Sequence, residues 1–109
     1  MIDQFWRRAT VARVVDGDTI DFDIDLGWDL TLRERCRLLD VNTPEMRTPE
    51  GKRWKTLVIS WLGNEPVWLK CAKYRRGKYG RSLVEVFKDS SGGLGPCLNE
   101  FIKEGMGDG

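Results

Sequence analysis

The sequence has 109 residues, a net charge of +1, three cysteines and no histidine, so it has room for one domain with a modest core. The lack of histidine excludes Ser-His-Asp and Cys-His nucleophiles and histidine-containing zinc sites, so any general base must be a carboxylate or a metal-bound hydroxide. The three cysteines are far apart and form no Cys-x-x-Cys pair, which excludes a zinc ribbon and a disulfide framework and favours free thiols in a reducing compartment.

The first half of the chain predicts three strands. Residues 10–15 form the first and enter an Asp16-Gly17 turn. From residue 20 to 26, apolar side chains alternate with Asp, which is the pattern of a strand with one buried and one solvated face. Asp18 is in phase with the apolar set, so we expect it to point inward, where a carboxylate needs a cation. A third strand is expected over residues 30–41.

A helix is predicted to begin at Thr48-Pro49 and to end at Gly63, with Trp54 and Trp61 on its apolar, core-facing side. The following segments are expected to be a strand (67–72), a basic loop (73–80), a strand (81–87), a flexible turn (89–95) and a short helix ending at Gly105. This order predicts an α+β, mainly β fold, a five-stranded OB-type barrel with two short helices, as a single domain over residues 1–109.

The N-terminal residues show no apolar run after their charges, so we expect no signal peptide and a cytoplasmic location. No stretch is apolar and long enough to span a membrane, so we expect no membrane partner. Residues 16–25 hold five Asp and no basic residue, whereas residues 70–81 hold six Lys or Arg and no acidic residue. Two blocks of opposite sign favour a metal-binding end and a phosphate-binding end.

Three short segments carry side chains suited to phosphodiester hydrolysis: Asp16-Gly17-Asp18-Thr19, the stretch from Arg37 to Glu45, and Lys78-Tyr79-Gly80-Arg81. Together they supply hard oxygen ligands for a metal, a spare carboxylate for a water molecule, and two arginines for the charge that develops on phosphorus. Arginine suits this role because its planar guanidinium can hold two phosphate oxygens at once and stays charged.

In their order and spacing, these segments resemble the staphylococcal nuclease (thermonuclease-like) family, over about residues 11–105. The resemblance implies a Ca²⁺-dependent nuclease that cleaves DNA, RNA or both with little sequence preference and leaves 3′-phosphate ends. The roles that it implies are metal binding by Asp18, Asn42 and the Thr43 carbonyl, water activation by Glu45, phosphate clamping by Arg37 and Arg81, and contact with a terminal phosphate by Lys78 and Tyr79.

The sequence departs from the family at two places. Asn42 stands where the family has an aspartate, so one of the metal ligands loses its charge. The site should therefore bind Ca²⁺ weakly, prefer another divalent cation or bind none. Asp40, two residues earlier, can restore part of the lost charge. The resemblance also implies a third helix, which this sequence, ending at Gly109, does not contain. Either the small barrel suffices, or a partner such as a second copy covers the open face in a homo-oligomer, or the domain is marginally stable.

Other readings of the same residues stay open. Asp21, Asp23 and Asp25 are expected on a solvated strand face, which Arg33 and Arg35 would share with Arg37. The hydrophobic pattern does not indicate whether Trp6, Trp28 and Trp68 are buried or exposed. The segment from Lys73 to Arg76 either tracks a nucleic-acid backbone or is a solvated loop. The rival function is a non-catalytic nucleic-acid-binding module, which Asn42 favours and the set Arg37, Glu45 and Arg81 opposes. A protein-interaction domain is the weaker third alternative.

Overall fold

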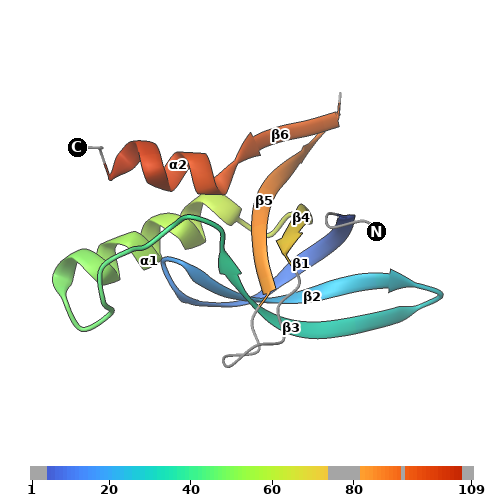
Figure 1. Cartoon of the computed structure of the whole chain (residues 1–109), viewed down its shortest axis with the longest axis horizontal. Helices are drawn as coiled ribbons and strands as arrows, with labels where there is room; N and C mark the ends of the chain where they lie inside the picture. The colour runs from blue at the N-terminus through green and yellow to red at the C-terminus, as the bar shows by residue number, and fades with distance from the viewer. Residues whose placement is uncertain (1–4, 74–81, 92, 107–109) are drawn as a thin grey trace.

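A computed structural model describes residues 5–73, 82–91 and 93–106 (Figure 1). In these ranges the chain forms six strands and two helices. In chain order they are β1 (Phe5–Asp16), β2 (Thr19–Gly27), β3 (Leu30–Leu38), α1 (Pro49–Leu62), β4 (Val67–Lys73), β5 (Ser82–Ser90), β6 (Gly93–Cys97) and α2 (Leu98–Gly105). No helix in these ranges is long and apolar enough to cross a membrane.

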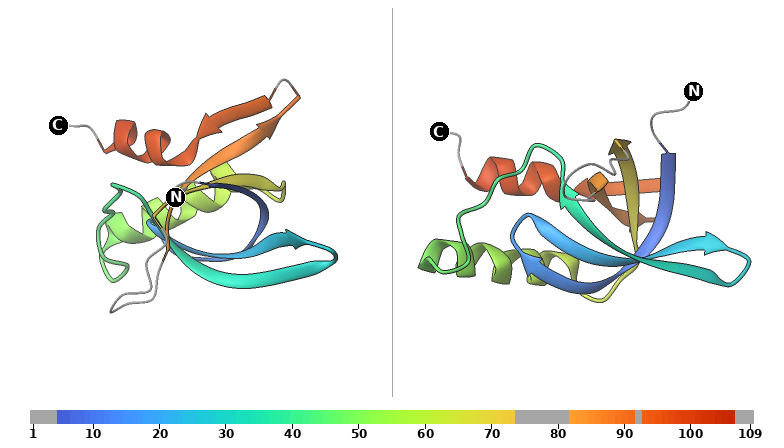
Figure 2. Two further views of the ribbon diagram at one scale, coloured as in Figure 1. Left: turned by 45° about the vertical axis from the view of Figure 1, so that its right-hand side comes forward. Right: turned by 60° about the horizontal axis from the view of Figure 1, so that its bottom comes forward.

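Five strands close into a barrel, as the sequence predicts for an OB-type fold. β1 pairs antiparallel with β2 and β4, β2 pairs with β3, and β4 pairs with β5. The barrel closes where β3 and β5 run parallel, with Cys36 opposite Ser82 and Leu38 opposite Val84. Both helices lie on one side of this barrel, and the β2–β3 hairpin extends away from it on the other side (Figures 1 and 2).

Three expected boundaries are wrong. β1 begins at Phe5 instead of residue 10, because residues 5–9 pair with β4. β3 ends at Leu38 instead of residue 41, because Asp40 adopts a left-handed conformation with φ 60° and turns the chain out of the strand. The flexible turn expected over 89–95 is instead a hairpin, in which β5 continues to Ser90 and β6 returns beside it. Gly93, with φ 129°, supplies the backbone conformation that this tight return requires.

The core is formed by apolar side chains from the barrel interior and from the inner faces of both helices. Trp54 of α1 is only 3% exposed, as predicted, and Trp61 is partly buried against the same core. Phe101 of α2 packs against both indoles, with ring centroids 6.4 Å from Trp54 and 6.1 Å from Trp61. Gly105 ends α2 against α1, because a Cβ at this position would lie 2.7 Å from the Trp54 ring.

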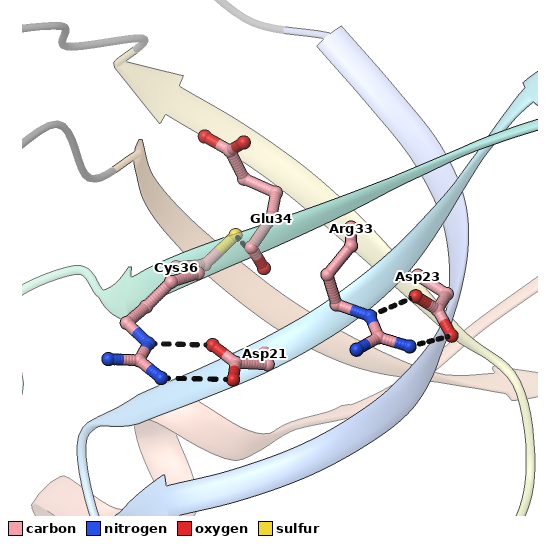
Figure 3. A network of polar contacts seen from close by, with 6 residues as sticks. Asp21, Asp23, Arg33, Glu34 and Cys36 are labelled. Atoms are coloured by element: carbon pink, nitrogen blue, oxygen red, sulfur yellow. Dashed lines mark hydrogen bonds and ion pairs between the residues drawn. The ribbon is translucent and has the colours of Figure 1, made fainter.

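The outer face of the β2–β3 hairpin carries paired charges (Figure 3). Arg35 donates to both carboxylate oxygens of Asp21, over 2.8 and 3.1 Å, and Arg33 pairs in the same manner with Asp23 directly across the ladder. The hydrogen bond from Arg35 holds the pKa of Asp21 below its ordinary value. These pairs are solvent-exposed, so each contributes little to stability, and the expectation of a solvated strand face is confirmed for them.

Candidate active site

The turn between β1 and β2 is fixed by its own side chains. The Oδ1 atom of Asp16 accepts a hydrogen bond of 3.0 Å from the Asp18 amide, so Asp16 shapes the turn as the sequence predicts. Gly17 has no room for a side chain, because a Cβ there would lie 2.7 Å from Oγ1 of Thr43. The turn is therefore packed directly against the segment that follows β3.

The Asp18 side chain points inward, as its phase in the sequence predicts, and the residue is only 6% exposed. Its Oδ1 accepts from the Thr19 hydroxyl over 3.1 Å, and its Oδ2 accepts from the Thr43 amide over 3.1 Å. Burial opposes ionisation, but hydrogen bonding to Asp16 and Thr43 and the charge of Arg37 outweigh it, so the pKa of Asp18 lies below its ordinary value. Asp18 is therefore a carboxylate at neutral pH.

Arg37 lies between the two side chains that are the predicted metal ligands. Its Nη2 donates to Oδ1 of Asn42 over 2.9 Å and to the Val41 carbonyl over 3.4 Å, and it lies 3.7 Å from Oδ2 of Asp18. Arg33 and Arg35, which share its strand face, are instead held by carboxylates of β2. The structure therefore separates Arg37 from its neighbours and brings it together with Asp18, Asn42 and Thr43.

Glu45 has a closely packed backbone and an exposed side chain. Its carbonyl accepts hydrogen bonds from the Thr48 hydroxyl (2.6 Å) and amide (3.0 Å), and a Cβ on Gly51 would lie only 1.9 Å from the same oxygen. The Glu45 side chain is 70% exposed and accepts a 2.8 Å hydrogen bond from Nε of Arg47. Among the described residues, no contact joins this carboxylate to Asp18 or Arg37, so the structure does not bring it into the cluster.

The donor atoms at this site suit a hard cation but carry little charge. The Asp18 carboxylate, the Asn42 amide oxygen and the Thr43 carbonyl are the ligand types that Ca²⁺ takes. The described part of the chain contains no group of three or more His, Cys, Asp or Glu that could hold a metal ion. The side chain of Arg37 competes for the same oxygens. The ligand types therefore suit a divalent cation, although the set carries only one formal negative charge, that of Asp18.

The other three predicted site residues, Lys78, Tyr79 and Arg81, lie outside the described residues. Arg81 directly precedes Ser82, and Ser82 pairs with Cys36, the neighbour of Arg37 in β3.

Asn99 is a residue that the sequence analysis did not find. It lies on α2, is fully buried, and donates from Nδ2 to the carbonyls of Leu39 (3.0 Å) and Val84 (3.1 Å), while its Oδ1 accepts from the Val86 amide over 3.0 Å. It therefore ties α2 to β5 and to the turn that leads to Asn42. In the sequence, the feature that could have indicated this role is a polar amide beside Leu98 on the otherwise apolar face of the predicted helix.

No protein-family model matches the chain. The chain is 40% identical to a thermonuclease from Staphylococcus intermedius over 83 residues, which are 71% of this chain and 46% of that protein. It is 34% identical to a thermonuclease from Staphylococcus hyicus over 83 residues, with the same two shares. The chain spans about half the length of these curated relatives.

Proposed function

The chain carries a staphylococcal nuclease-like domain, and we propose that this domain hydrolyses phosphodiester bonds of DNA, RNA or both with little sequence preference. The observation that carries the proposal is the convergence of Arg37, Asp18, Asn42 and Thr43, which come from three separate parts of the chain. A buried carboxylate, an amide oxygen and an arginine that contacts both are groups that suit phosphoryl chemistry.

Asp18, Asn42 and the Thr43 carbonyl would hold a divalent cation, Ca²⁺ in the first instance. When bound, such an ion polarises a phosphoryl oxygen and lowers the pKa of a coordinated water. The hydrogen bond from the Thr43 amide to Asp18 supports this assignment, because it fixes the two segments that supply the ligands relative to one another. The neutral Asn42 leaves the site with less charge than an aspartate would provide, and weak affinity is expected.

Arg37 and Arg81 would hold the phosphoryl oxygens and stabilise the charge that they gain as water attacks. Arg37 now donates hydrogen bonds to Asn42 and Val41 and forms an ion pair with Asp18. A substrate phosphate would therefore replace these protein oxygens as the partner of the guanidinium. Lys78 and Tyr79 would contact a terminal phosphate.

Glu45 would take or steer the proton of the attacking water, because the chain has no histidine for this task. Its fixed backbone supports this role, and its exposed carboxylate would have to leave Arg47 to reach the substrate. In-line attack with cleavage of the 5′ P–O bond would leave 3′-phosphate ends.

The test is incubation of the protein with labelled single-stranded DNA and RNA in calcium, magnesium or manganese, and in chelator. The proposal predicts cleavage with calcium, none with chelator, and products that phosphatase treatment converts to 3′-hydroxyl ends. Binding without cleavage in all three metals would instead support the rival function, a nucleic-acid-binding module whose metal site is weakened by Asn42.

A further inference from the structure

The outer side of β1, β4 and β5 gathers aromatic and cationic side chains in one place. The strand registers put Trp6 opposite Lys70 and Arg8 opposite Trp68 between β1 and β4, and Trp68 opposite Phe87 between β4 and β5. Most of the residues that alternate with them are buried in the barrel, namely Ala9, Val67, Leu69 and Val86, whereas Arg7 is exposed. We call this surface the tryptophan face, and define it by Trp6, Arg8, Trp68, Lys70 and Phe87.

Both indoles of the tryptophan face are held in fixed orientations. The Trp6 ring centroid lies 5.3 Å from that of Phe87, and Nζ of Lys70 lies 5.7 Å from the Trp6 ring. The Arg8 guanidinium lies 5.0 Å from the Trp68 ring, and Nε1 of Trp68 donates over 3.3 Å to Asp89, which also pairs with Arg8. Fixed aromatic groups lose little conformational freedom when a ligand binds.

An open hollow of about 430 Å³ lies beside the two indoles, and its lining is Trp6, Trp68, Asp89, Gly93 and Leu94. Leu94 of β6 is 49% exposed and forms an apolar wall opposite the rings. The volume falls within the range of about 300–1,000 Å³ that is typical of pockets for small ligands. A flat aromatic ring with one polar edge suits such a hollow.

A second hollow, which Trp68 also lines, differs from the first in having acidic residues in its lining. It measures about 880 Å³, and its lining includes the carboxylates of Asp23, Asp25 and Asp29. Asp25 and Asp29 have no ion-pair partner among the described residues, so this side repels phosphate. A nucleic-acid strand on the tryptophan face would therefore run on the Leu94 side, away from the tip of the β2–β3 hairpin.

The outer face of β5 connects the tryptophan face with Arg37. Arg37 is opposite Leu83, and Leu83, Glu85 and Phe87 alternate with buried residues along the strand. Four residues of a strand span about 13 Å. At 3.4 Å per stacked nucleotide, this corresponds to roughly four nucleotides.

We propose that the tryptophan face is a second binding surface for single-stranded nucleic acid, where bases stack on Trp6 and Trp68 while a phosphodiester a few nucleotides away lies at Arg37. The inference rests on the proposed function, because it takes the nuclease substrate as its ligand. Arg8 pairs with Asp89, and Lys70 lies opposite Glu85, so neighbouring carboxylates offset the two cations of the face. Stacking therefore supplies its affinity, which should depend on strand length and little on salt.

The experiment measures binding of 5′-fluorescein-labelled (dT)15 by fluorescence anisotropy in chelator, over a range of salt concentrations. Trp68→Ala and Trp6→Ala should each weaken binding by about tenfold or more, in line with the loss of one stacked base, without changing the slope of affinity against salt. Trp28→Ala is the matched control, because it removes an indole that is 95% exposed at the tip of the β2–β3 hairpin and should leave binding unchanged. Trp68→Leu, which keeps an apolar group, replaces Trp68→Ala if thermal melting shows that the alanine variant is unfolded.

Calcium-dependent cleavage of the dinucleotide (dT)2 separates this inference from the proposed function, because (dT)2 is too short to reach the tryptophan face from Arg37. The face is supported if the two variants cleave (dT)2 at the parent rate and bind (dT)15 more weakly. Folded variants that bind (dT)15 as tightly as the parent overturn the inference and leave the nuclease intact. A parent that neither binds (dT)15 nor cuts either substrate overturns both.

Discussion

Nη2 of Arg37 donates a 2.9 Å hydrogen bond to Oδ1 of Asn42, one of the proposed metal ligands. The same guanidinium lies 3.7 Å from the buried Asp18 carboxylate. The proposed phosphate ligand and the proposed metal ligands are therefore in contact before any substrate is present. We therefore expect a change at position 42 to affect both the proposed cation site and the position of this arginine.

Asn42→Asp should bind Ca²⁺ more tightly than the parent and should remain active, because it adds a negative oxygen ligand beside Asp18. Isothermal titration calorimetry measures the two affinities, and cleavage of single-stranded DNA measures activity. Equal affinities would show that residue 42 is not a metal ligand.

Arg37→Lys should lower the turnover number by about 10²–10³, because lysine supplies one point charge where the guanidinium supplies a fork of donors. Arg81→Lys should have a similar effect. Arg35→Lys is the matched control, since Arg35 lies on the same strand face but pairs with Asp21, and it should cleave at the parent rate. An Arg37→Lys variant as active as this control would remove Arg37 from the mechanism.

Glu45→Gln should reduce calcium-dependent cleavage steeply and retain salt-sensitive binding to single strands, because glutamine keeps the shape but cannot accept a proton at neutral pH. Glu50→Gln is the control, because Glu50 is an exposed acid in the first turn of α1 that pairs with Arg53. Cleavage rates and filter binding should be measured on the same preparations. Full activity of Glu45→Gln would assign proton transfer to another group.

Asn99→Ala should destabilise the protein by about 1–3 kcal/mol for each backbone group that it leaves without a partner, namely the carbonyl of Leu39 and the amide of Val86. The Val84 carbonyl keeps its 2.9 Å hydrogen bond from the Leu39 amide. Urea denaturation measures this loss. Asn64→Ala, at an exposed position after α1, should change the free energy of unfolding by no more than about 0.5 kcal/mol. Similar midpoints for the two variants would contradict the bridging role of Asn99.

Burial raises the pKa of the Cys36 thiol from its ordinary value of 9.0 to about 12. The neutral thiol is favoured in the folded protein, so at pH 8 Cys36 should resist alkylation by iodoacetamide, whereas the less buried Cys97 should react first. Mass spectrometry of peptides gives the order, and labelling in urea, where all three cysteines should react, is the control. Since the unfolded thiol ionises above about pH 9, stability should fall as the pH rises from there towards 12. Equal labelling of Cys36 and Cys97 in the folded protein would contradict the predicted protection of Cys36 from alkylation.

The barrel could be predicted because its main strands have regular patterns. The alternation from Ile20 to Ile24 predicted both the strand and its buried face, and the same phase predicted that Asp18 points inward. Leu26, which continues the alternation, is instead 48% exposed. β6 could not be predicted in this way, because Gly93, Gly95 and Pro96 are residues typical of loops. Its strand conformation comes from pairing with β5, which no local pattern reveals.

The candidate site was predictable in its residues but not in its contacts. The strand phase drew attention to Asp18, and the family resemblance implied Asn42 and Thr43. The hydrogen bond from Arg37 to Asn42, in contrast, depends on how β3 ends at Leu38 and how the chain turns at Asp40. The orientation of Glu45 towards Arg47 is a side-chain preference on an exposed surface. Sequence patterns describe buried faces, and they do not decide among partners available to an exposed carboxylate.

The backbone around Glu45 also has a consequence for the timing of the proposed reaction. At one end of the segment from Thr43 to Thr48, the Thr43 amide donates a hydrogen bond to Asp18. At the other end, the Glu45 carbonyl accepts a hydrogen bond from the Thr48 hydroxyl and packs against Gly51. The Glu45 carboxylate can therefore move from Arg47 towards a substrate by rotating side-chain torsions, which for an exposed residue takes picoseconds to nanoseconds. We therefore expect no slow movement of the segment from Thr43 to Thr48 to be needed to place this group, and single-turnover cleavage should show no lag from such a step between substrate binding and the first bond broken.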